Sequence, residues 1–157
     1  MPILPAPTLA APPCAPAAIR VTTGARDGDF SGMSHGGTLV ILTNRGRFAC
    51  SLPGLPTIAL RDAHGRMLPA IRRAPVGMHP GPVVRPVILR PGERASTGIR
   101  WVSGPVYDAS RCYDARSIRV RLGRGGVNAP LRAHLCGPGN AAPTFDQPVL
   151  TRDRPAR

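Results

Sequence analysis

Short hydrophobic segments separated by turn-forming residues recur along the chain and predict β-strands rather than helices. In residues 117–122 apolar side chains alternate with arginines, which places Arg119 and Arg121 on the face opposite the apolar one. Residues 131–135 repeat this alternation, whereas residues 38–43 form a continuous apolar run that predicts a strand buried on both faces. The remaining predicted strands are residues 19–22, 57–60, 87–89, 96–102 and 147–150.

Seven or eight short strands without helical periodicity predict an all-β protein, an immunoglobulin-like two-sheet antiparallel sandwich. The 20 prolines and 18 glycines interrupt every stretch long enough to form a long helix. We expect a Pro/Ala-rich extended linker over residues 1–13, the sandwich over 14–151 and a polar tail over 152–157. Residues 123–130 are predicted to form a loop, and the proline-rich segment 73–86 an irregular and functional one.

The formal net charge of +13 indicates an anionic partner, but the composition offers a second explanation. All 21 basic residues are arginines, and Ala, Gly and Pro are abundant, which is also typical of a genome rich in G and C. The charge therefore reflects either a selected binding role or coding bias with a solvated surface. With one Trp, two Tyr and three Phe, the chain offers few side chains for base stacking, which argues against nucleic acid. Arg119, Arg121 and Arg132 form the candidate anion-binding strip, with a solvated polar face as the alternative.

Four cysteines, Cys14, Cys50, Cys112 and Cys136, predict two disulfide bonds in an oxidising compartment. No two of them are spaced closely enough for a typical structural zinc site. Three connectivities are open to four cysteines, and buried reduced thiols are a further alternative. We favour Cys14–Cys50 and Cys112–Cys136 because each pair closes a loop within one half of the chain.

The first residues and the apolar runs of the chain bear on where the protein is located. Residues 1–13 have neither the basic start nor the apolar core of a signal peptide, so we expect export with the signal trimmed or lying upstream. No apolar run approaches the roughly 20 residues that a transmembrane helix needs. We therefore expect an exported protein, which is periplasmic, extracellular or anchored to the envelope.

Several sequence pieces together resemble a known family. They are residues 43–46 (Thr-Asn-Arg-Gly), the Cys-x-Leu-x-Gly-x-Pro run at 50–56, residues 87–93 with their Pro-Gly turn, Ile99 to Trp101, and Cys112 followed by the alternating strand. On these pieces the chain resembles, over roughly residues 14 to 150, the bacterial secreted domain-of-unknown-function family 4232. The resemblance implies an exported or lipid-anchored protein with an immunoglobulin-like sandwich. It implies no catalytic residue and no cofactor, because the family has none assigned.

Three motifs hint at other chemistry, and each lacks the context that the chemistry needs. Ser34 lies in a Gly-x-Ser-x-Gly motif, but a polar loop precedes it and a strand follows, the reverse of a nucleophile elbow. Gly123-x-Gly125 lacks the third glycine and the following helix of a dinucleotide loop. Asp62 and His64 share one turn and make at best a weak metal site. We therefore expect no catalytic, cofactor or metal site, and we place Trp101 in the core between the sheets.

These observations favour a non-enzymatic exported cell-envelope module with an interaction or structural role. The alternatives are an arginine-mediated binder of an anionic envelope polymer or nucleic acid, and a small serine hydrolase that uses Ser34. The expected partner is another envelope protein or an anionic polymer.

Overall fold

The regular structure of the protein is almost entirely β-strand. The computed structural model describes residues 11–24, 34–73, 75 and 84–154. Within these ranges the one helical turn is η1 (Pro16–Ala18), a 3-10 turn, and no helix is long and apolar enough to cross a bilayer. The described strands are β1 (Ile19–Gly24), β2 (His35–Asn44), β3 (Cys50–Leu52), β4 (Ile58–Arg61), β5 (Ile71–Arg73), β6 (Val87–Leu89), β7 (Arg94–Val102), β8 (Ser110–Leu122), β9 (Gly125–Pro138), β10 (Thr144–Asp146) and β11 (Thr151–Arg152).

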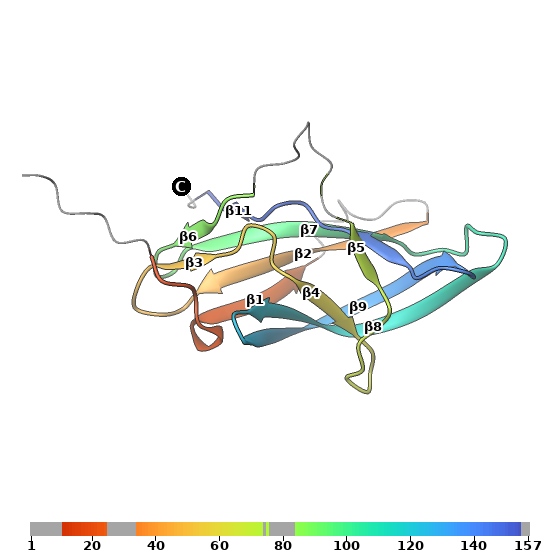
Figure 1. Ribbon diagram of the computed structural model, residues 1–157, viewed down its shortest axis with the longest axis horizontal. Helices are drawn as coiled ribbons and strands as arrows, with labels where there is room; N and C mark the ends of the chain where they lie inside the picture. The colour runs from red at the N-terminus through yellow and green to blue at the C-terminus, as the bar shows by residue number, and fades with distance from the viewer. Residues whose placement is uncertain (1–10, 25–33, 74, 76–83, 155–157) are drawn as a thin grey trace, which may run out of the picture.

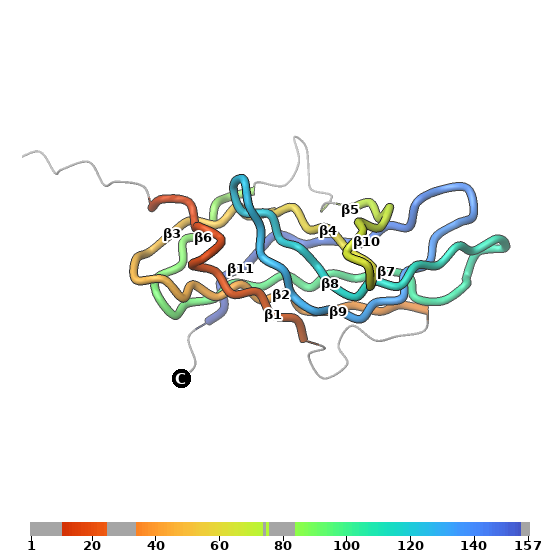
Figure 2. Tube along the Cα trace, turned by 90° about the horizontal axis from the view of Figure 1, so that it is seen from below, coloured from red at the N-terminus to blue at the C-terminus, as the bar shows by residue number. Residues whose placement is uncertain are grey.

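The larger sheet has six strands in the order β1-β2-β7-β10-β5, and β11 also pairs with β7. Its pairs are antiparallel except for β10 with β5, which run parallel. The smaller sheets are β4-β8-β9, all antiparallel, and the two-stranded β3-β6. The β8–β9 hairpin runs along the long axis of the molecule (Figures 1 and 2). This arrangement confirms the expected all-β antiparallel sandwich.

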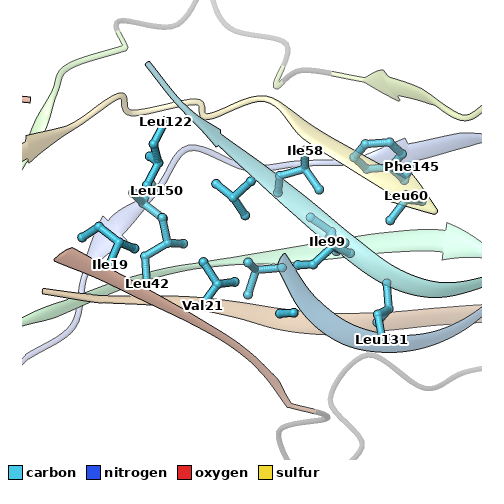
Figure 3. Close-up of a cluster of buried hydrophobic side chains, with 14 of the residues drawn as sticks. Ile19, Val21, Leu42, Ile58, Leu60, Ile99, Leu122, Leu131, Phe145 and Leu150 are labelled. Carbon is cyan, nitrogen blue, oxygen red and sulfur yellow. The ribbon is translucent and has the colours of Figure 1, made fainter. Parts of the chain in front are cut away.

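The core lies between the sheets, because the longer strands alternate buried and outward-facing residues. Side chains of both sheets meet there, among them Leu42 of β2 and Ile58 of β4 (Figure 3). Trp101 of β7 is 5 % exposed, which confirms the predicted buried position. Its indole packs over Gly36 of the neighbouring β2, where a Cβ would come 2.8 Å from the Trp101 Nε1.

The strands differ from the prediction in several respects, and β3 and β5 lie where none was predicted. Residues 125–130 belong to β9 and not to a loop, because only Gly123 and Arg124 separate β9 from β8. Residues 147–150 lie outside the strands, and β10 and β11 flank them. The predicted strand at 38–43 is buried on one face of β2 rather than on both, because β2 lies within the larger sheet of a two-layer packing. Arg152 pairs with Ala95 of β7, so the larger sheet extends past residue 151.

Both predicted disulfide bonds are present. Cys14–Cys50 links the segment before η1 to β3, where the Cys14 N–H also donates to the Ser51 carbonyl oxygen. Cys112–Cys136 links directly opposite residues of β8 and β9. Residues 1–10, most of the expected linker, lie outside the described residues, as do 74 and 76–83 of the expected functional loop.

Candidate functional site

The outer face of the β4-β8-β9 sheet carries the predicted arginines of β8. Ile118, Val120 and Leu122 point into the core, so the residues between them must point outward. Arg119 lies opposite Ala59 of β4, and the Arg121 backbone N–H donates to the Thr57 carbonyl oxygen at 2.9 Å. These neighbours on β4 are small, and Arg121 is exposed while Arg119 is half-buried.

Two further arginines join them around one recess. Arg61 ends β4 on the same outer face as Ala59, and Arg124 lies in the two-residue turn between β8 and β9. The recess has a volume of about 240 Å³. We call it the arginine recess; it is lined by Thr57, Ala59, Arg61, Met67, Arg119, Arg121, Arg124 and Gly125.

The hydrogen-bond acceptors of Arg119 and Arg121 are neutral oxygen atoms. Arg119 Nη1 donates to the Asn128 side-chain oxygen at 3.1 Å, and Arg121 Nε donates to the Gly123 carbonyl oxygen at 3.3 Å. The Arg61 Nε–H is buried and finds no acceptor among the described residues. No carboxylate lines the arginine recess. No lining residue therefore neutralises the positive charge of the recess. The buried Arg61 Nε–H also remains without a hydrogen-bond acceptor among the described residues.

A glycine on β9 sets the position of Arg119. A Cβ at Gly126 would lie 2.8 Å from the Arg119 Nε, so the Arg119 side chain lies close against the glycine backbone. In this position Arg119 reaches Asn128 two residues farther along the same strand. The hydrogen bond and the close packing orient Arg119 before any ligand binds.

Asp62 follows Arg61 but belongs to a turn rather than to the recess. Its Oδ1 accepts hydrogen bonds from the backbone N–H groups of His64 and Arg66, both at 2.9 Å. The bond from Arg66, ahead of that from His64, holds the pKa of the Asp62 carboxyl below its usual value. Asp62 and His64 were the candidate weak metal pair. The Asp62 Oδ1 already accepts two backbone hydrogen bonds within the turn.

The structure separates Arg132 from Arg119 and Arg121. Arg132 is exposed on β9. It lies about 13 Å along the strand from the register partner of Arg119 and about 20 Å from that of Arg121. It does not line the arginine recess. The sequence strip of three arginines is therefore replaced by a cluster of four. Outward alternation of residues 59 and 61 could have found Arg61, but only the pairing of β4 with β8 shows where it lies.

A larger recess of about 920 Å³ lies at the other end of the β8–β9 hairpin. It includes Tyr107, Asp108, Arg111 and Asn140. With one acid and one base among mostly small neighbours, it favours no single ligand chemistry.

Ser34 precedes β2 directly and has a φ of 62°. A nucleophile elbow places a helix after the serine, whereas β2 is a strand. The residues of the motif before Ser34 lie outside the described part of the chain. Gly123, with a φ of 59°, forms the hairpin turn with Arg124 and opens no helix that could bind phosphate.

Comparison with known proteins identifies the family but no characterised relative. No curated protein and no solved structure shows a significant match to the chain. The profile of one family, described as Domain of unknown function (DUF4232), matches residues 14–151. This range contains all four cysteines and the arginine recess. The chain therefore belongs to the DUF4232 family, as its sequence pieces indicated.

Proposed function

We propose that the protein is an exported, non-enzymatic binding module that holds an anionic polymer of the cell envelope at the arginine recess. The observation that carries the proposal is the convergence of four arginines on one recess without a lining carboxylate. Two disulfide bonds among the described cysteines are compatible with an oxidising compartment outside the cytoplasm.

Arginine suits an oxyanion because its planar guanidinium presents several N–H donors in a fixed fork. Arg119 and Arg121 each donate a side-chain hydrogen bond to a neutral oxygen of the described residues, and each guanidinium has further N–H groups that can bind a ligand. The Arg61 Nε–H adds a buried donor without an acceptor in the described structure. Together these groups can bind the phosphate or carboxylate groups of a polymer.

The size of the recess favours a polymer segment over a whole small molecule. Pockets that enclose a small molecule measure about 300–1,000 Å³, and the arginine recess measures about 240 Å³. No aromatic side chain lines it, so base stacking would have no platform there. These two features favour charge recognition of a repeating anionic group over recognition of a nucleic acid.

The test is a binding titration with labelled inorganic polyphosphate and labelled poly-glutamate, followed by fluorescence anisotropy at several salt concentrations. R119Q/R121Q removes two recess charges, and R20Q/R152Q removes two exposed charges from the other sheet as the matched control. We expect R119Q/R121Q to bind at least about tenfold more weakly than the unmodified protein. The slope of the logarithm of the binding constant against the logarithm of the salt concentration should also be smaller in magnitude by about one or more. We expect R20Q/R152Q to stay within about twofold of the unmodified protein.

The proposal would be contradicted if R119Q/R121Q and R20Q/R152Q lost equal affinity for the polymer, or if the affinity did not change with salt concentration. A single-stranded oligonucleotide in the same assay distinguishes nucleic acid, which we expect to bind more weakly than polyphosphate. A fluorophosphonate probe distinguishes the serine hydrolase, since strong labelling of Ser34 would contradict a non-enzymatic module.

A further inference from the structure

Four reactive or metal-binding side chains share a second site on the outer face of the β8–β9 hairpin. Cys112 lies opposite Cys136, and Asp114 lies opposite His134. Residues two apart on a strand point to the same face, so the two cysteines lie beside the Asp114–His134 pair. A ring nitrogen of His134 and the two sulfur atoms lie within 4.8 Å of one another. Spacing along the sequence conceals this cluster because its members on different strands are 20 or more residues apart.

The disulfide of this cluster is more accessible than the other one. Cys112 is exposed, while Cys136 is 2 % exposed. Cys14 and Cys50 are 5 % and 6 % exposed, so neither sulfur of that bond faces solvent to the same extent. Exposed disulfides are the ones that an external thiol attacks most readily. A dithiol should therefore reduce Cys112–Cys136 before Cys14–Cys50.

Asp114 prepares His134 to act as a ligand. The His134 Nδ1 and the Asp114 Oδ1 are 2.8 Å apart, and because an ionised carboxylate only accepts hydrogen bonds, the Nδ1–H is the donor. In the neutral ring the Nε2 then keeps its lone pair. A carboxylate that orients a histidine in this way is the usual support of a metal-binding imidazole.

The distances suit a metal once the sulfur–sulfur bond is open. Zinc binds thiolate sulfur at about 2.3 Å and imidazole nitrogen at about 2.0 Å, so neighbouring ligand atoms of a tetrahedral site lie about 3.5–3.8 Å apart. One ring nitrogen of His134 and the two sulfur atoms are already within 4.8 Å of one another. Small side-chain movements on a rigid hairpin are therefore enough to complete the coordination.

We propose that Cys112, Cys136 and His134 form a redox-gated site for a zinc-like metal ion, with Asp114 as the positioning residue. A dithiol reductant supplies two electrons and two protons, which yields two protein thiols and a disulfide on the reductant. On binding one divalent ion the two thiols release two protons, and water completes the coordination. Exchange with a small-molecule disulfide then transfers two electrons from the protein thiolates to that disulfide, which re-forms the Cys112–Cys136 bond, expels the ion and leaves two thiols on the oxidant after uptake of two protons.

The test uses the full chain, treated with increasing amounts of a dithiol. Alkylation of free thiols followed by peptide mass mapping should label Cys112 and Cys136 before Cys14 and Cys50. The partly reduced protein is then titrated with Zn²⁺ in competition with a chromogenic chelator. We expect one Zn²⁺ per reduced chain, none for the oxidised chain, and thiolate-to-metal charge-transfer absorption when Co²⁺ replaces Zn²⁺.

Variants separate ligation from a structural effect. H134A should weaken Zn²⁺ binding more than tenfold, and D114N should weaken it about tenfold while the charge-transfer band stays. H64A, which removes an exposed histidine from a different turn, should bind Zn²⁺ like the unmodified protein. Earlier reduction of Cys14–Cys50, absence of one-to-one binding, or equal affinities of H134A and H64A would each overturn the proposal.

Discussion

The fold depends strongly on one buried asparagine at the end of β2. Asn44 is 0 % exposed, and its Nδ2 donates to the carbonyl oxygens of Phe48 and Leu89, each at 2.9 Å. Its Oδ1 accepts the Gly46 N–H at 2.9 Å. The side chain therefore joins the β2–β3 loop to β6, which lies 45 residues farther along the chain. Replacement by alanine removes all three hydrogen bonds.

The loss of folding stability expected for N44A follows from these three hydrogen bonds. Each contributes about 1 kcal/mol net, and the Leu89 carbonyl, which accepts a buried bond, is left without this donor. We therefore expect the free energy of unfolding to fall by about 3–4 kcal/mol. N140A removes an exposed loop asparagine and should change it by less than about 0.5 kcal/mol.

Urea denaturation followed by tryptophan fluorescence measures both variants. Trp101 is the single tryptophan of the chain and is buried, so its emission reports on opening of the core. For a slope of about 2 kcal/mol per molar urea, N44A should lower the midpoint by about 1.5–2 M. A loss below about 1 kcal/mol for N44A, or an equal loss for N140A, would refute this assignment.

Three further predictions concern packing, crosslinking and acid stability. G36A places a Cβ 2.8 Å from the Trp101 Nε1 and should lower the free energy of unfolding by about 1–3 kcal/mol in the same urea assay. C14S/C50S opens a loop with a sequence separation of 36 and should lower it by about 4 kcal/mol on the loop-entropy account. Backbone hydrogen bonds lower the pKa of Asp62, so they stabilise the fold above its unfolded pKa of about 3.9 and are lost as pH falls through the folded value. The advantage of the unmodified protein over D62N in urea midpoint should therefore shrink as the pH falls below the unfolded pKa of Asp62.

A different measured outcome would contradict each of these three predictions. G24A is the control for G36A, since a Cβ at Gly24 meets nothing within 4 Å, and equal losses would contradict the contact with Trp101. An unchanged urea midpoint in C14S/C50S would show that Cys14–Cys50 does not stabilise the fold. A constant difference between the unmodified protein and D62N across the pH range would exclude the proposed role of Asp62.

The fold was predictable where local pattern and final environment agree. The alternation of residues 117–122 predicted both the strand and its buried face, and the structure has the same residues in β8. Residues 125–130 were mistaken for a loop because glycine, asparagine and proline are typical of turns. In the structure they pair with β8, with Val127 opposite Val120. The backbone pairing along the long β8–β9 hairpin therefore outweighs the preference of these residue types for turns.

The candidate site was only partly predictable, because it combines strands that are distant in sequence. Arg119 and Arg121 follow from alternation within one strand. Arg61 joins them through the pairing of β4 with β8, some 58 residues apart, and no local pattern encodes that register. The register shift between Ala115 and Ser117 likewise changes how β9 runs beside β8 toward Arg132.

The most direct test of the arginine recess is a nuclear magnetic resonance titration of the isotope-labelled protein with inorganic tripolyphosphate. We expect the side-chain Nε–H signals of four arginines to shift together with one dissociation constant, namely Arg61, Arg119, Arg121 and Arg124. The signals of Arg20 and Arg152 on the other sheet should move little. Shifts of equal size on both sheets, or none at the four recess arginines, would contradict the claim that this recess binds anions.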